Sequence, residues 1–550
     1  MKDTNKIFYL LLFVLALAVN FAGINVKFFT DDPGLYASIA KNLLYKKEFF
    51  QLFTYNRDWL DKPHFPFWAI FASFKIFGIS VWAYRLPALL FFIISLVYTF
   101  IFTRKYYNWE VAAIAVLILM TAQNTILSNT DARAEPYLMG LLIGSIYHIA
   151  CLEERFTYKD LFLAALLTAL AIITKGIFVI TAIYGSLLGQ LLFQKKLKSL
   201  FRAKWLWLLA LTFIFTLPEF YALYIQFDLH PEKAVFGKQN VSGIKWFLWD
   251  SQFVRFVNTG PINRKISGSI FFYLHTLLWA FAPWCLLFYY SVFEKIKAIY
   301  RHKKPTEYYA LSGGLLLLLL FSLSRFQLPF YTNALFPLFA IITAPVCFDQ
   351  LSKFGTKFRI IGQWIFVVLL PVAVIVINIL LKPAGNLFFI IDIALFGIIF
   401  LLVTVKIKEA YKKVFFLNCA AALFAGFYVC TVFYSEMVPY KGQIAAAGYV
   451  SQKPFDNFHL YALTTENNIF QFYCKRPVDL IPIEQFNGFK PKGISIFYVN
   501  ELSMDYLKQT HAEFRIIRSF VNYPKENIDM NFIIKENRYE VLDHVYLITK

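Results

Sequence analysis

The chain is organised around the stretch between Phe28 and Trp68, which contains the segments DDPGLYASIA (31–40) and WLDKPHFPFW (59–68). Most of the sequence is apolar, yet this stretch follows directly after the first apolar run and gathers charged side chains and a histidine. The residues concerned are Asp31, Asp32, Arg57, Asp58, Asp61, Lys62 and His64. Carboxylates, a lysine and a histidine set among aromatic residues are the groups that a reaction site requires. We therefore predict that the loop 28–80 is catalytic.

The composition indicates an integral membrane protein. Of 550 residues, 59% are hydrophobic and 16% are charged, whereas a soluble domain has about 25% charged residues. The net charge of +20 could suggest nucleic acid as a partner. However, the basic residues fall in short loops between apolar runs, which is the positive-inside pattern of a protein that crosses the membrane many times. We therefore expect a membrane-embedded protein that binds no nucleic acid.

About thirteen apolar runs between residues 7 and 434, one of them over 268–292, approach the roughly 17–25 residues that a bilayer-spanning helix needs. The charge pattern places the N-terminus in the cytoplasm and the C-terminal part outside an inner or plasma membrane. We predict an all-α polytopic membrane domain over 1–436. A small extracytoplasmic α/β domain is predicted over 437–550, with strands near 460–463, 494–499 and 545–548 and a helix near 504–510.

Asp31 and Asp32 cannot both face the same reactants, because adjacent side chains point in different directions on a regular element. A carboxylate at the edge of an apolar region has a raised pKa, which suits a base. Capping of the following helix is an equally good explanation of these residues. For Asp61, Lys62 and His64, the alternatives are a phosphate or divalent-cation site and an ordinary aromatic interface belt.

Other charged residues fall at the same predicted face of the membrane. The segment Asp131-Ala132-Arg133-Ala134-Glu135 ends an apolar run, where its charges are either paired with one another or functional. Lys175 and Arg325 could extend their side chains to the interface or hold a lipid phosphate, and Arg255 is a weaker candidate of the same kind.

Missing motifs narrow the class of function. The sequence contains no Asp-x-Asp and no Gly-rich phosphate loop, so a nucleotide-activated donor lacks its usual binding site. Few charges, such as Glu219 and Asp392, lie within the apolar runs, unlike the midplane site of a transporter. A transporter or flippase of lipid-linked sugar and a noncatalytic subunit of an envelope-assembly complex remain as alternatives to an enzyme.

The sequence resembles the polyprenyl-phosphate-sugar glycosyltransferases, which include protein O-mannosyltransferases and the transferases that modify lipid A with aminoarabinose. Asp32 followed by Tyr36 resembles the acidic motif of their first loop, and residues 61–68 look like their Glu-Lys-Pro-Pro-Leu-Pro-Tyr-Trp segment. Further likenesses are Arg85-Leu86-Pro87, Lys175-Gly176, Pro283-Trp284 and Leu328-Pro329-Phe330-Tyr331.

The resemblance implies a GT-C-like fold and an inverting transfer of a monosaccharide from a polyprenyl phosphate to a lipid, glycan or protein on the outer face. It implies that Asp32 is catalytic and that Lys62, Lys175 and Arg325 bind the donor phosphate. Two departures from the family pattern are Pro33, in place of a second acid, and His64, in place of a proline. No cofactor is required, although Asp61 and His64 could hold a divalent cation.

Overall fold

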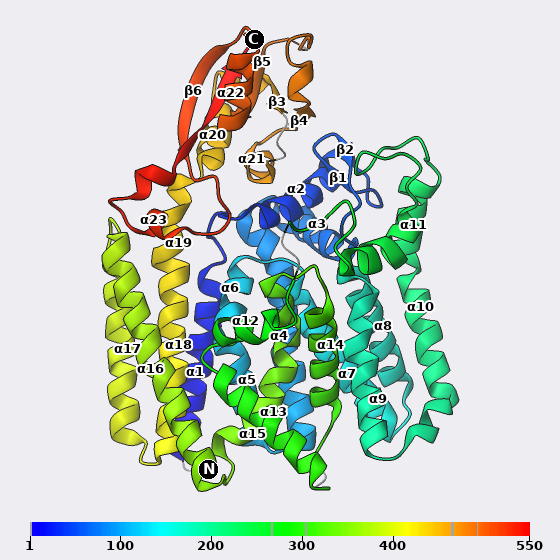
Figure 1. The fold of residues 1–550 in the computed structure, drawn as a ribbon, viewed down its shortest axis with the longest axis vertical. Helices are drawn as coiled ribbons and strands as arrows, with labels where there is room; N and C mark the ends of the chain where they lie inside the picture. Colours follow the sequence, from blue (N-terminus) through cyan, green and yellow to red (C-terminus); the bar gives the residue numbers. More distant parts are fainter. Residues whose placement is uncertain (1–2, 266–267, 303–304, 464–466, 492) are drawn as a thin grey trace.

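The computed structural model describes residues 3–265, 268–302, 305–463, 467–491 and 493–550. A bundle of helices forms most of the molecule, and a small sheet domain sits at one end of it, opposite the end where the chain begins (Figure 1). The bundle contains α1 (Asp3–Ala22), α4 (Val81–Tyr106), α5 (Trp109–Thr121), α6 (Gln123–Thr130), α7 (Glu135–Glu154), α8 (Tyr158–Lys175), α9 (Ile180–Phe193), α10 (Ala203–Leu223), α12 (Phe272–Ala280), α13 (Cys285–Tyr300), α14 (Tyr309–Leu323), α15 (Phe336–Phe348), α16 (Lys353–Leu381), α17 (Leu387–Lys406) and α18 (Ala410–Tyr428).

Seven helical stretches of the described residues are long and apolar enough to cross a membrane. An eighth is obtained if α5 and α6, which meet at a bend of 56°, form one span, and four further apolar helices are shorter. The mostly helical membrane fold is therefore confirmed, but the predicted number of about thirteen spans is not. The expected continuous span over 268–292 is wrong: α12 ends at Ala280 and α13 begins at Cys285. Pro283 lies in the break, where it supplies no backbone N–H for a continuous helix.

Two helices of the predicted catalytic loop lie across the end of the bundle (Figure 1). These are α2 (Asp31–Lys46) and α3 (Phe65–Phe77), joined through the short strands β1 (Phe53–Thr54) and β2 (Arg57–Asp58). Most of α2 is buried, because the C-terminal domain packs on it from the side away from the bundle.

The C-terminal domain is the predicted α/β unit. Its sheet has the order β4-β3-β5-β7-β6, and β5 is buried at its centre, parallel to β3 and antiparallel to β7. The strands are β3 (His459–Leu463), β4 (Asp479–Ile481), β5 (Ser495–Asn500), β6 (Arg515–Asn522) and β7 (Asp543–Thr549), and the helices are α20 (Gly442–Val450), α21 (Asn468–Tyr473), α22 (Glu501–Gln509) and α23 (Met530–Ile533). The three predicted strands and the predicted helix are confirmed, whereas β4 and β6 were not predicted.

Candidate functional site

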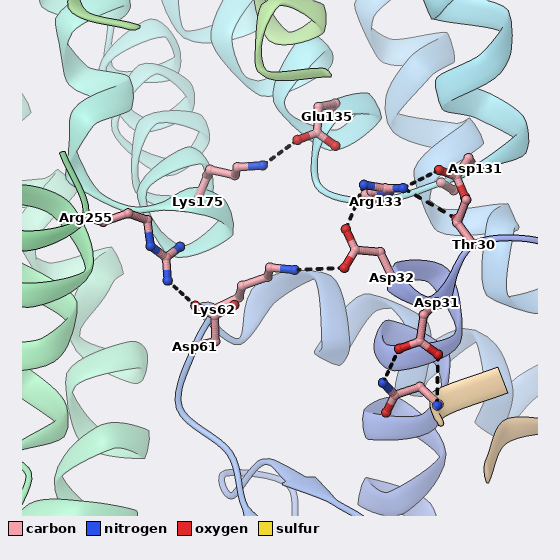
Figure 2. A network of polar contacts seen from close by, with 12 residues as sticks. Thr30, Asp31, Asp32, Asp61, Lys62, Asp131, Arg133, Glu135, Lys175 and Arg255 are labelled. Atoms are coloured by element: carbon pink, nitrogen blue, oxygen red, sulfur yellow. Dashed lines mark hydrogen bonds and ion pairs between the residues drawn. The ribbon is translucent and has the colours of Figure 1, made fainter. Parts of the chain in front are cut away.

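Asp31 and Asp32 point in opposite directions from the first turn of α2 (Figure 2). The Asp32 carboxylate accepts a hydrogen bond of 2.7 Å from Nη1 of Arg133, and its other oxygen lies 3.9 Å from Nζ of Lys62. The Asp31 carboxylate instead accepts hydrogen bonds from the side chain of Asn468 (2.6 Å) and from its backbone N–H (3.0 Å). The sequence prediction that only one of the two faces a reaction site agrees with this arrangement, and that residue is Asp32.

The two carboxyl groups have opposite pKa shifts. Burial raises the pKa of Asp32, but the charges of Lys62 and Arg133 outweigh that effect and hold its pKa at about 2. Burial raises the pKa of Asp31 to about 6, against the lowering effect of the hydrogen bond from Asn468. The expectation that the carboxylate facing the reactants has a raised pKa is therefore wrong, because the sequence does not reveal how closely the cations approach Asp32.

The other charges around Asp32 form a chain of ion pairs (Figure 2). Arg133 bridges Asp32 and Asp131, with 2.6 Å to the second carboxylate. Lys175 pairs with Glu135, which comes directly after the Arg133 turn. Pairing within the 131–135 segment and contact with Asp32 therefore occur together, so the two interpretations left open by the sequence are not exclusive.

Asp61 and Tyr36 also contact basic side chains of the site. Arg255 pairs with Asp61, which brings the loop between α10 and α12 against the predicted catalytic loop. The ammonium group of Lys62 lies 4.7 Å from the ring centre of Tyr36, and that of Lys175 lies 4.6 Å from the ring centre of Tyr331. Both distances allow cation–π attraction, which orients the ammonium groups without neutralising them.

These residues line a cavity of about 570 Å³ whose lining combines charged and apolar side chains. The charged lining residues are Asp32, Asp61, Lys62, Arg133, Lys175, Arg255, Arg264 and Glu526. The apolar lining comes chiefly from the segment 177–180, from the end of α14 and from aromatic residues of 326–331. The backbone of Gly176 has φ of +105°, which ends α8 directly after Lys175, a residue of the cavity lining.

Six of the predicted site residues do not line this cavity: Asp31, Asp131 and Glu135, whose partners are described above, and the three residues Arg325, Arg85 and His64. Arg325 is exposed, and its neighbours Ser324 and Phe326 line the cavity instead. Arg85 is buried and donates hydrogen bonds to the carbonyl oxygens of Thr130 (2.6 Å) and Ile24 (2.9 Å), so it holds the turn that precedes α2.

His64 is the third. Its Nδ1 lies 3.0 Å from Oε1 of Glu219, and its backbone N–H donates to the other oxygen of the same carboxylate at 3.0 Å. Both side chains are buried, so this pair fastens the start of α3 to α10. Asp61 and His64 thus have separate partners, and the described residues contain no group of three or more His, Cys, Asp and Glu side chains placed to hold a metal ion. The divalent-cation site stays a prediction.

The C-terminal domain is hydrogen-bonded to α2 at both ends of the short helix α21. Asp31 accepts from the backbone N–H of Asn468 at its first turn. The buried ammonium group of Lys41 donates to the carbonyl oxygens of Gln471 (2.9 Å), Phe472 (3.0 Å) and Cys474 (2.5 Å) at its last turn. These are the backbone groups that a helix leaves without internal partners. The C-terminal domain therefore helps to place α2, and with it Asp32.

Arg264, Glu526 and Lys41 are the residues at or near the site that sequence reasoning missed. Arg264 belongs to a long loop and Glu526 to the C-terminal domain, and neither lies in a motif that marks it. Lys41 could have been noticed, since it stands alone as a charge within the apolar run of α2.

The bundle, the crossing helices α2 and α3 and the C-terminal sheet define the fold of the membrane glycosyltransferases that the sequence resembles. Crystal structures of ArnT from Cupriavidus metallidurans align with a TM-score of 0.73 for the form bound to undecaprenyl phosphate and 0.72 for the apo form. The first is 17% identical and covers 98% of this chain and 97% of its own, and the second is 16% identical and covers 100% and 98%.

Comparisons of sequence agree with this fold. Residues 61–221 match the family model of dolichyl-phosphate-mannose-protein mannosyltransferases. An uncharacterised protein of Aquifex aeolicus (strain VF5) is 25% identical over 460 residues, which is 81% of this chain and 82% of that protein. The resemblance to polyprenyl-phosphate-sugar glycosyltransferases is thereby confirmed.

Proposed function

We propose that this chain is an inverting glycosyltransferase that moves a monosaccharide from a polyprenyl phosphate to an acceptor on the outer face of the membrane. The observation that carries the proposal is the cavity lining, which combines basic side chains with apolar ones. A lipid phosphate needs both, because it has an anionic head and a hydrocarbon chain. The crystal structure of ArnT from Cupriavidus metallidurans bound to undecaprenyl phosphate supports this choice of donor.

The charge of the cavity also fits a phosphate. Its lining contains five basic side chains (Lys62, Arg133, Lys175, Arg255, Arg264) and three acidic ones (Asp32, Asp61, Glu526), which is a formal excess of two positive charges on the lining itself. Asp131 and Glu135, which do not line the cavity, reduce this excess through their pairs with Arg133 and Lys175. A sugar joined through a phosphodiester has one negative charge, and the departing lipid phosphate has up to two. The excess therefore stabilises the leaving group more than the donor, which is the condition for catalysis.

In the proposed reaction, an acceptor hydroxyl attacks the anomeric carbon from the side opposite the phosphate. The new C–O bond forms while the bond to the phosphate oxygen breaks, and the electron pair of that bond stays on the phosphate. With a pKa of about 2, Asp32 remains ionised and orients the hydroxyl by accepting its hydrogen bond. The departing phosphate, whose second pKa is about 6, is a better final acceptor for the proton than Asp32.

The outer-face orientation rests on the distribution of charge. The predicted cytoplasmic loops, rich in Lys and Arg, include the ends of α4 and α17 and the start of α16. These lie at the end of the bundle where the chain begins, and the C-terminal domain lies at the other end (Figure 1). The positive-inside rule then favours a cytoplasmic N-terminus and an extracytoplasmic cavity.

The test is a transfer assay with radiolabelled polyprenyl-phosphate sugars and a native membrane extract as the source of acceptor. We expect transfer by the wild-type protein and a loss of at least 100-fold in Asp32→Asn, as is usual for removal of one electrostatic contact to reacting atoms. Asp505→Asn, an exposed position in the C-terminal domain, is the matched control. Full transfer by Asp32→Asn would overturn the site, and movement of lipid-linked sugar across vesicles without transfer would favour a flippase.

The same assay tests whether transfer requires a divalent metal ion. Transfer that survives EDTA supports a site in which side-chain cations alone hold the phosphate. Transfer that EDTA abolishes and Mg²⁺ restores supports a divalent cation, for which Asp61 is the predicted ligand that lines the cavity.

A further inference from the structure

Glu526 is the one described residue of the C-terminal domain that lines the cavity. It lies in the loop between β6, which ends at Asn522, and α23, which begins at Met530. The other lining residues all belong to the chain before residue 332. The C-terminal domain therefore supplies one wall of the site as well as holding α2.

The loop that carries Glu526 is held on both sides of it. The ammonium group of Lys441, which is 4% exposed, donates to the carbonyl oxygens of Tyr523 (3.0 Å) and Lys525 (3.2 Å). The hydroxyl of Tyr523 donates to the carbonyl oxygen of Asn527 at 2.7 Å. A buried lysine and a buried tyrosine thus fix the backbone directly before and after Glu526, which is the support that a binding residue needs.

An aromatic cluster connects this loop with the stretch that leads to Asp32. The rings of Tyr523 and Phe532 stack at 3.8 Å, and the ring of Phe29 packs against them at 6.2 and 6.4 Å. Phe29 is three residues before Asp32 and Tyr523 is three residues before Glu526. Because one packed cluster anchors both segments, the backbone at Glu526 is held relative to the backbone at Asp32.

The carboxylate of Glu526 differs from the other two carboxylates of the cavity in its ion pairing. Asp32 is paired with Arg133, and Asp61 is paired with Arg255. Within the described part of the chain, no basic side chain forms an ion pair with Glu526. Its carboxylate is exposed and can accept hydrogen bonds from a ligand without giving up an internal partner.

The donor is a poor ligand for this carboxylate, because its phosphate is anionic and the cations that attract it lie around Asp32 and at the end of α8. The acceptor comes from the aqueous side, where the C-terminal domain stands. We propose that Glu526 is a specificity-determining residue that binds the acceptor, and that the acceptor presents hydroxyl or ammonium groups beside its reacting hydroxyl. This inference rests on the proposed glycosyltransferase function and names the substrate class of the same site.

The experiment compares Glu526→Ala, Glu526→Gln and wild type in the transfer assay, with the membrane extract and the radiolabelled donor titrated separately. We expect the amount of extract that gives half-maximal transfer to rise about tenfold in Glu526→Ala, as for loss of a hydrogen bond to a charged group. Glu526→Gln keeps an oxygen that accepts hydrogen bonds, so its half-saturating amount of extract should lie between those of wild type and Glu526→Ala. The half-saturating donor concentration and the maximal rate stay within twofold of wild type.

The control is Glu513→Ala, at an exposed position of the same domain outside the cavity lining. An unchanged extract titration in both Glu526 variants would overturn the inference, as would a shift in donor saturation alone. Equal melting temperatures of the three proteins exclude misfolding as the cause. No transfer by wild type would instead overturn the proposed function, and this inference with it.

Discussion

Replacing Lys41 by Met tests whether the C-terminal domain holds α2 in place. Lys41 is 2% exposed, and its ammonium group is the donor to three carbonyl oxygens at the last turn of α21, those of Gln471, Phe472 and Cys474. Methionine has a similar length and fits the same space, so packing changes little. The substitution removes three hydrogen bonds, but it also removes the free-energy cost of burying the ammonium charge.

The magnitude follows from the groups left behind. A buried carbonyl that loses its donor costs about 1–3 kcal/mol, so three of them cost about 6 kcal/mol at the middle of that range. The regained cost of burying the charge, several kcal/mol, reduces the net loss to about 3 kcal/mol. The change weakens the docking of α21 on α2 and leaves the bundle unaffected. A loss of 3 kcal/mol increases the open fraction of this contact about 100-fold.

Hydrogen exchange measures that fraction directly. The amides of α21 should exchange about 100-fold faster in Lys41→Met. The maximal rate of transfer should also fall, because Asp32 lies in the first turn of α2, the helix that contains Lys41. Lys46→Met, at an exposed position near the end of α2, serves as the control and should exchange as wild type does. Unchanged protection of α21 in Lys41→Met would refute the argument that this lysine holds the domain to the helix.

Three other outcomes are expected. Since Asp32 has a pKa of about 2, its ionisation does not limit transfer between pH 4 and 8. Arg133→Gln removes one of the charges that lower this pKa, so the rate of transfer should begin to fall with acidity at a higher pH than in wild type. Lys175→Met leaves the carboxylate of Glu135 buried without its partner and should cost about 3–5 kcal/mol, seen as a lower melting temperature that the double change with Glu135→Gln largely restores. Arg325→Ala should leave the half-saturating donor concentration within twofold of wild type, because this side chain lies outside the cavity.

Features of the fold that depend on neighbouring residues in the chain were predictable. Apolar runs identify membrane helices because water is absent from the bilayer core, and short apolar runs between polar segments identify β3, β5 and β7 as strands. The break between α12 and α13 was missed because the run 268–292 has no Asp, Glu, Lys or Arg and is long enough for a span, although Pro283 lies within it. Strand β4 has three residues and β6 is largely exposed, so neither produces a strong pattern.

The candidate site was predictable at the positions that its motifs mark. Asp32, Lys62 and Lys175 line the cavity, as the resemblance to the glycosyltransferases implies. Arg325 was placed there by its position in the chain, but its side chain points elsewhere. The direction of a side chain at the start of a turn depends on the packing of that turn, and sequence does not specify it.

The amino-acid sequence establishes that this is a helical membrane protein with a charged loop at one face, and that Asp32 is the acid to examine. Only the tertiary structure decides which charges meet. Asp32 is 101 residues from Arg133, and Asp31 is 437 residues from Asn468. A pKa depends on burial and on distances through space. The raised pKa therefore belongs to Asp31, which binds the C-terminal domain, and the lowered one to Asp32, which faces the cavity.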